Sequence, residues 1–244
     1  MSAIWTPSRQ RISASNFTRF QEQLSSSHGL VFDSYNSLHA WSVAEPDAFW
    51  SEVWDFCGFV GDKGETAFRP GASIMECSFF PEAQLNVAET LLKNADGRDA
   101  IIFHAEEGRR VVWSRAELRD RVSRIAAALA AHGVTKGNCV AGIVPNMPET
   151  VAAALAVAAL GAVWASCSPD FGADAICDRL SQIEPKILFA ADGYSYHGKI
   201  FDIREKLRIV TESLPTVEKT VVWPHVLQPE DLDGIPKAEP LESF

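Results

Sequence analysis

The sequence lacks the residue clusters that form disulfide frameworks, structural metal sites or basic binding faces. Its five cysteines are scattered and include no C-x-x-C pair, so we predict buried, reduced thiols in the cytoplasm and no metal site. Lys and Arg number 22 against 32 Asp and Glu, a formal net charge of −10. This deficit of positive charge argues against nucleic acid and membrane partners, although it permits a local basic pocket for a phosphorylated small molecule.

Long apolar segments are also missing. Residues Met1 to Arg11 contain no apolar core of a signal peptide. The longest apolar stretch, Val151 to Cys167, has 17 residues, is rich in alanine and contains Gly161. It is marginal in length and too weakly apolar for a bilayer, so we predict a buried helix followed by a buried strand.

Catalytic signatures are absent as well. The sequence has no G-x-S-x-G, H-E-x-x-H or G-x-G-x-x-G motif, and its six histidines lie far apart. From the residues alone we therefore predict no catalytic group and no metal ligand.

Regular alternation of strand and helix patterns is present from Leu85 onward. A hairpin is predicted at 100–104 and 110–113, and the S-x-x-E capping box of Ser114 and Glu117 begins a helix that ends at Gly133. Further strands are predicted at 139–144, 162–167, 186–190 and 220–223, with helices at 148–160, 173–183 and 200–214. Single helices between strands favour parallel pairing, so the fold class is α/β, with a doubly wound and mostly parallel sheet.

Composition divides the chain into three parts. Residues 1–80 form a mainly helical cap that is rich in aromatics, with Phe17, Phe20 and Leu24 at helical spacing. Residues 81–224 form the α/β lobe. Residues 225–244 are interrupted by proline and show no helix or strand period, so we predict a linker.

Two segments are candidates for ligand binding. Gly193–Lys199 has the G-x-x-x-x-G-K spacing of a phosphate-binding loop, but Ile200 replaces the Ser or Thr that binds magnesium. A phosphate contact by Lys199 without full loop geometry is favoured over a true P-loop. The second segment is Ser168–Gly172, which follows a central strand at the sheet edge where ligands bind. From the residues alone, Ser168 or Asp170 is expected to cap the next helix.

Several spaced motifs resemble the adenylate-forming acyl-CoA synthetase superfamily. They are Phe80-Pro81 with Leu85–Ala88, Trp113–Leu118, Gly133–Val140, and Pro145–Glu149 with Leu160–Val163. Ala165–Gly172, followed by Asp178–Leu180 and Gln182–Lys186, looks like the acetoacetate branch of that superfamily. Trp5-Thr6-Pro7 and Leu38–Val43 are also similar to that branch.

The resemblance implies a ligase that uses acetoacetate, ATP, Mg²⁺ and CoA. It implies that this chain is the N-terminal portion, inactive alone, which packs on a C-terminal part that carries most of the ATP and Mg²⁺ site. The CoA-binding residues that it implies are Ser168, Pro169, Asp170, Phe171, Gly172, Tyr196 and Lys199. Tyr196 stands where related enzymes carry an arginine, so Tyr196 would stack on adenine while Lys199 neutralises a phosphate. The alternatives are a nucleotide-binding domain that uses Gly193–Lys199 and a non-catalytic α/β interaction module.

Overall fold

The computed structural model describes residues 4–227 and 232–244. The chain divides into two compact units, Met1–Leu85 and Asn86–Phe244. Each unit is described by itself.

The first unit is built from short helices around an aromatic core. Its helices are α1 (Arg9–Ser13), α2 (Asn16–His28), α3 (Tyr35–Ala44) and α4 (Pro46–Cys57). Two small antiparallel pairs follow, β1 (Gly61–Asp62) with β4 (Gln84–Leu85) and β2 (Phe68–Arg69) with β3 (Ser78–Phe79), and a 3-10 turn, η1 (Ile74–Glu76), lies between β2 and β3. Phe20, Leu24 and Leu38 are buried among aromatic rings. The prediction of a mainly helical, aromatic-rich region is confirmed.

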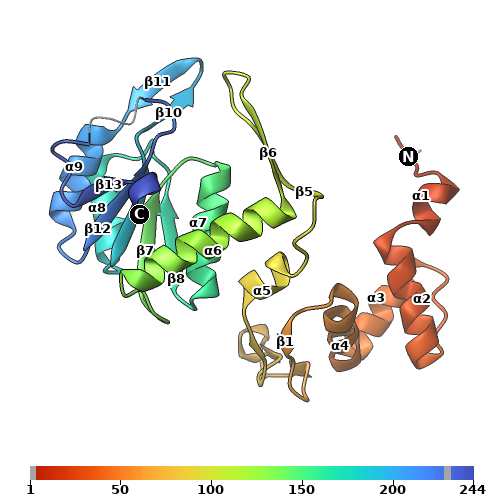
Figure 1. The fold of residues 1–244 in the computed structure, drawn as a ribbon. Coiled ribbons are helices and arrows are strands. Elements are labelled where there is room, and N and C mark those ends of the chain that lie inside the picture. The colour runs from red at the N-terminus through yellow and green to blue at the C-terminus, as the bar shows by residue number, and fades with distance from the viewer. Residues whose placement is uncertain (1–3, 228–231) are drawn as a thin grey trace. The chain divides into compact units, whose positions relative to one another are not determined.

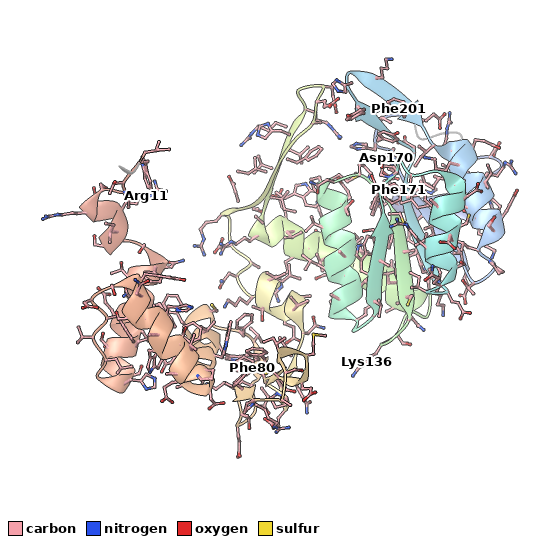
Figure 2. All side chains as sticks on the ribbon, turned by 180° about the vertical axis from the view of Figure 1, so that it is seen from behind. Arg11, Phe80, Lys136, Asp170, Phe171 and Phe201 are labelled. Carbon is pink, nitrogen blue, oxygen red and sulfur yellow. The ribbon has the colours of Figure 1, made fainter. Side chains whose placement is uncertain are left out.

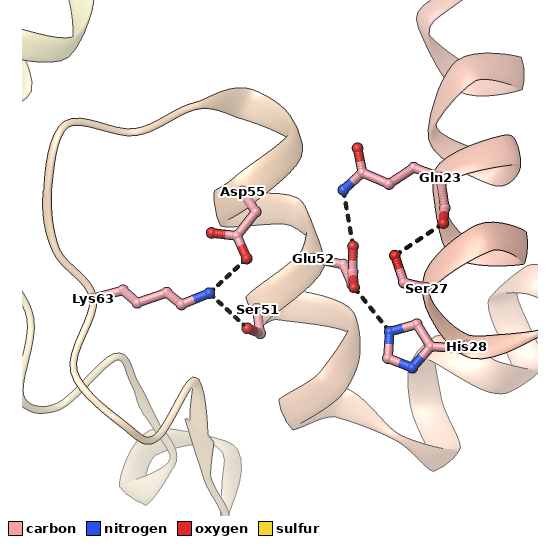
Figure 3. Close-up of polar contacts among 7 residues, drawn as sticks. All are labelled: Gln23, Ser27, His28, Ser51, Glu52, Asp55 and Lys63. Atoms are coloured by element: carbon pink, nitrogen blue, oxygen red, sulfur yellow. Dashed lines mark hydrogen bonds and ion pairs between the residues drawn. The ribbon is translucent and has the colours of Figure 1, made fainter.

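Polar side chains link α2 to α4 in this unit (Figure 3). The carboxylate of Glu52 accepts a hydrogen bond from Gln23 Nε2 at 2.8 Å and lies 2.9 Å from His28 Nε2. Lys63 Nζ donates to Ser51 Oγ at 3.0 Å and to Asp55 Oδ2 at 2.6 Å, which holds the following loop against α4. These contacts fix the helices around the aromatic core.

The second unit begins with α5 (Val87–Leu92) and the hairpin of β5 (Asp99–His104) and β6 (Arg110–Ser114), followed by α6 (Arg115–Ala131). The predicted capping box is present, because Glu117 N donates to Ser114 Oγ and Ser114 N donates to Glu117 Oε2. The helix ends as predicted at Gly133, whose φ of +71° turns the chain.

Five parallel strands form the sheet of the second unit. They are β7 (Cys139–Ile143), β8 (Val163–Cys167), β9 (Ile187–Ala191), β12 (Lys219–Trp223) and β13 (Ala238–Pro240), in the order β13-β12-β9-β7-β8. The strands are connected by α7 (Pro148–Ala159), α8 (Ala173–Ser181) and α9 (Arg204–Ser213). Figure 1 shows α6 and α7 on one face of the sheet and α8 and α9 on the other. The predicted doubly wound α/β class is confirmed.

Strand alternation divides the core of this unit between the two faces. Val140, Phe189 and Val221 point toward α6 and α7, whereas Ala141 and Leu188 point toward α8 and α9. Because both faces are covered, the inner strands β7 and β9 are continuously apolar, as the sequence predicted for 139–144. The apolar stretch 151–167 contains most of α7 and strand β8, so the helix and the strand are confirmed. The prediction that the strand is buried is wrong, because β8 lies at the edge of the sheet and only Cys167 is buried in it.

One predicted helix begins later than expected. The sequence predicts a helix from Ile200, but α9 begins at Arg204 and is preceded by an antiparallel hairpin of β10 (Gly193–Tyr196) and β11 (Lys199–Asp202). His197 and Gly198 both have positive φ, +51° and +69°, as a two-residue type I′ turn requires. The aromatic and β-branched residues on either side favour strands, so the local turn overrides the helical period.

The prediction that residues 225–244 lack regular structure is wrong for their last part. β13 pairs in parallel with β12, and the short turn η2 (Leu241–Ser243) follows it. Leu241 and Phe244 pack against the core on the α6 and α7 face. This strand forms by pairing with β12, and its three residues are too few to show an alternating apolar pattern in the sequence.

In residues 4–227 and 232–244, no helix has both the length and the apolar content that crossing a bilayer requires. None of the five cysteines forms a disulfide. Only Cys167 is buried, Cys57 is exposed and the other three are partly exposed, so the prediction of buried thiols is wrong for four of the five.

Candidate functional site

The predicted ligand-binding residues lie at the carboxyl edge of the parallel sheet. The strand order reverses between β7 and β9, and in such sheets ligands bind at the carboxyl ends of the strands beside that point. Figure 2 shows Asp170, Phe171 and Phe201 at this end of the sheet and Lys136 at the opposite end. The loop after β8 and the hairpin after β9 therefore share one edge.

The loop Ser168–Gly172 connects β8 to α8. The structure corrects the capping prediction, because Gly172 is the N-cap of α8 and no side chain caps the helix. Phe171 N donates to Ser168 O at 3.2 Å, and this turn leaves Ser168 and Asp170 ahead of the capping position. Pro169 is buried while Asp170 is exposed. The uncapped backbone N–H groups of α8 are therefore available to an anion.

The rest of the loop is held by α8. The guanidinium of Arg179 lies 4.9 Å from the centre of the Phe171 ring, and Phe171 packs against the apolar cluster on the α8 and α9 face. Burial raises the pKa of the Cys167 thiol, which ends β8 just before the loop. Cys167 is therefore a neutral apolar neighbour of the loop.

The β10–β11 hairpin presents different residues on its two faces. Tyr194 pairs with Phe201 and Tyr196 with Lys199, so these four residues share one face. The rings of Tyr194 and Phe201 stack at 4.9 Å, and Tyr196 is 59% exposed beyond them. Tyr194 packs against the same apolar cluster as Phe171, which places this face on the side of the Ser168–Gly172 loop.

The hairpin contradicts the P-loop alternative. A P-loop follows a strand and leads directly into a helix, with its backbone wrapped around phosphates. Here Gly193–Lys199 forms two paired strands and a turn. Gly193 also lies against the partner strand, because a Cβ added to it would lie 2.4 Å from Phe201 O.

A cavity of about 650 Å³ lies against the opposite face of the hairpin, which carries Ser195 and Ile200. The tip of the β5–β6 hairpin forms its other wall, where Glu106 Oε2 accepts a hydrogen bond from Gly198 N at 3.2 Å. Arg109 Nη2 donates to His225 Nδ1 at 3.2 Å and connects that tip to the segment after β12. Tyr196 and Lys199 belong to the other face, so this cavity is separate from the predicted site.

Asp192 organises the segment after β12, and the sequence reasoning missed it. Its buried carboxylate accepts hydrogen bonds from the backbone N–H groups of His225, Val226 and Leu227 at 2.9–3.1 Å. The available signal was a carboxylate placed directly after the continuously apolar strand β9. Asp192 therefore shapes the carboxyl edge rather than binding a ligand.

Acidification is expected to destabilise the second unit through His225. Burial lowers the pKa of His225, and the charge of Arg109 lowers it further, against the opposing carboxylates of Asp192 and Glu107. The unfolded chain, with an ordinary value of 6.5, then binds the proton more readily than the folded chain. The stability contribution is complete above pH 6.5 and is lost as the pH falls toward the lower folded value.

Urea unfolding at pH 7.5 and pH 5 measures this effect. His225→Asn keeps an oxygen acceptor for Arg109 and does not titrate, so its stability should fall less on acidification than that of the wild type. The exposed His104, changed in the same way, is the control and should behave as the wild type. Equal acid losses in the wild type and His225→Asn would refute the role of His225.

In the described ranges 4–227 and 232–244, no group of three or more His, Cys, Asp or Glu side chains is placed to hold a metal ion.

Comparison with known proteins gives a family match over most of the second unit. The family model for AMP-binding enzymes matches residues 88–241. The acetoacetyl-coenzyme A synthetase of Rhizobium meliloti (strain 1021) is 44% identical over 218 residues, which cover 88% of this chain and 33% of that protein. The acetoacetyl-CoA synthetase of Xenopus tropicalis is 37% identical, over 99% of this chain and 36% of that protein.

A solved structure is similar over the whole chain. The acetoacetyl-CoA synthetase from Streptomyces lividans superposes with a TM-score of 0.88 at 35% identity, over 100% of this chain and 38% of that one. The chain therefore spans about a third of the length of the curated relatives it matches. The resemblance that the sequence motifs predicted is confirmed by these matches.

Proposed function

The chain belongs to the AMP-binding enzymes, and from this membership we propose that it forms the N-terminal part of an ATP-dependent acetoacetate–CoA ligase. In the proposed reaction, acetoacetate and ATP give acetoacetyl-adenylate and pyrophosphate. The CoA thiol then attacks the adenylate and gives acetoacetyl-CoA and AMP. Proteins named acetoacetyl-CoA synthetase among the relatives support this substrate assignment.

The observation that carries the proposal is the shared side of the Ser168–Gly172 loop and the hairpin face that bears Tyr196 and Lys199. Phe171 and Tyr194 pack against one apolar cluster and anchor these two segments. We assign this surface to the nucleotide end of CoA. The uncapped N–H groups of α8 and the ammonium of Lys199 would attract phosphates, and Tyr196 would stack on adenine.

ATP and Mg²⁺ are assigned to the rest of the longer ligase. The described residues supply no carboxylate cluster for a metal ion, so we derive no step through Mg²⁺ from this chain. We further propose that the chain packs on that remaining part, acts in the cytoplasm, and has neither nucleic-acid nor membrane partners. The net charge of −10 and the free thiols support this assignment.

Pyrophosphate release from acetoacetate and ATP tests the activity. We expect release by the longer ligase and none by the 244-residue chain alone. Turnover by the chain alone would refute the view that catalytic groups lie elsewhere. Partner capture, with no turnover by either protein, would favour a non-catalytic interaction module.

Charge reversal at Lys199 tests the CoA surface. Lys199→Glu in the longer ligase should raise the KM for CoA about fivefold to tenfold and leave the KM for acetoacetate unchanged, because only the phosphate contact is lost. Lys136→Glu, at the opposite end of the sheet, is the matched control (Figure 2). An unchanged KM for CoA in Lys199→Glu would show that Lys199 does not bind it.

A further inference from the structure

Lys206 connects α9 to the Ser168–Gly172 loop. It lies in the first turns of α9, and its Nζ donates a hydrogen bond of 2.6 Å to the carbonyl oxygen of Pro169, 37 residues earlier in the chain. Pro169 is buried and has no N–H group, so its carbonyl is the only backbone group through which the loop can be held at this residue.

The ammonium of Lys206 is partly removed from water. Burial lowers the pKa of Lys206, and the negative charge of Asp170 opposes this shift. A buried cation must be compensated by hydrogen bonds or an opposite charge. The Pro169 carbonyl and the Asp170 carboxylate, both in the Ser168–Gly172 loop, provide this compensation.

The negative charge of Asp170 disfavours phosphate binding by the loop, and the positive charge of Lys206 acts against this effect. An exposed carboxylate in the middle of a loop that binds phosphates would repel the ligand. The positive charge of Lys206 interacts with the negative charge of Asp170 and reduces the negative potential that the loop presents to an anion at the start of α8. Arg179 holds Phe171 from α8, so the loop is attached to both helices on this face.

We infer that Lys206 is a positioning residue for the CoA-binding loop, which it holds through Pro169 and whose negative potential near Asp170 its charge reduces. The inference rests on the proposed function. It assigns two separable effects to one side chain, a hydrogen bond that fixes the shape of the loop and a charge that makes it attractive to phosphates.

Three variants of this chain separate the two effects. Lys206→Met removes both, Lys206→Arg keeps the charge and a donor, and Lys206→Met with Asp170→Asn removes both charges. Lys136→Met is the matched control because Lys136 lies at the other end of the sheet (Figure 2). Hydrogen exchange of the amides of Ser168, Asp170, Phe171 and Gly172 measures the shape of the loop, and calorimetry with CoA measures ligand affinity. Circular dichroism verifies that each variant is folded.

We expect Lys206→Met to accelerate exchange of these amides about tenfold and to raise the Kd for CoA about tenfold. Lys206→Arg should restore most of both values. The double variant should recover CoA affinity in part while its loop amides still exchange rapidly.

Unchanged exchange in Lys206→Met would overturn the inference, as would faster exchange with unaltered CoA affinity. Failure of the wild-type chain to bind CoA would instead refute the proposed CoA surface, and the exchange data would still show whether Lys206 fixes the loop. The two failures are therefore distinguishable.

Discussion

Replacement of Asp192 with alanine is expected to lower the free energy of unfolding by about 3 kcal/mol, because it leaves three backbone donors without their acceptor. The carboxylate is buried and accepts hydrogen bonds from the N–H groups of His225, Val226 and Leu227. Hydrogen bonds to a charged group are stronger than neutral ones, so their joint loss exceeds an ordinary surface effect. Urea unfolding measures the loss, and hydrogen exchange of residues 225–227 should accelerate.

Asp192→Asn provides a graded comparison. Its remaining oxygen can still accept the two hydrogen bonds that Oδ1 accepts from His225 and Val226, whereas the acceptor of Leu227 is lost. The asparagine variant should therefore lie between the wild type and the alanine variant. Asp178→Ala, at an exposed position of α8, is the control and should change stability by less than about 0.5 kcal/mol. Equal effects at Asp178 and Asp192 would show that the segment after β12 does not depend on Asp192.

Phe189→Ala is expected to lower the free energy of unfolding by about 3–5 kcal/mol and the melting temperature by roughly 10 °C. Phe189 lies on the central strand β9 and is fully buried. Its ring stacks on Trp223 at 5.1 Å and packs edge to face against Phe244 at 5.8 Å. The truncation removes these ring contacts and leaves a cavity between the sheet and the helices α6 and α7.

Phe201→Ala is the matched control for this prediction. Phe201 is 38% exposed on the β10–β11 hairpin, and its ring stacks on that of Tyr194. Its loss should cost about 1 kcal/mol. Thermal and urea unfolding compare the two variants, and equal losses would refute the assignment of Phe189 to the centre of the core.

Local signals in the sequence determined most of the α/β architecture. Three of these signals are each contained within a few neighbouring residues, so they can be recognised without knowledge of the fold. They are the capping box of Ser114 and Glu117, the glycine at 133 and the continuously apolar strands. The same is true of the site loop Ser168–Gly172, because its position after a buried strand places it at the carboxyl edge of a parallel sheet.

Only the tertiary structure decided the features that depend on distant partners. Strand β13 forms through pairing with β12, so the lack of any local period misled the sequence reasoning. The hairpin at 193–202 is a local element, and there the helical period was extended too far toward the N-terminus. The bond from Lys206 to Pro169 spans 37 residues, and Asp192 reaches donors more than thirty residues away. The sequence does not give the distance between such groups. Only the packing of the chain brings a charge that is removed from water to the hydrogen-bond partners that compensate for the lost hydration.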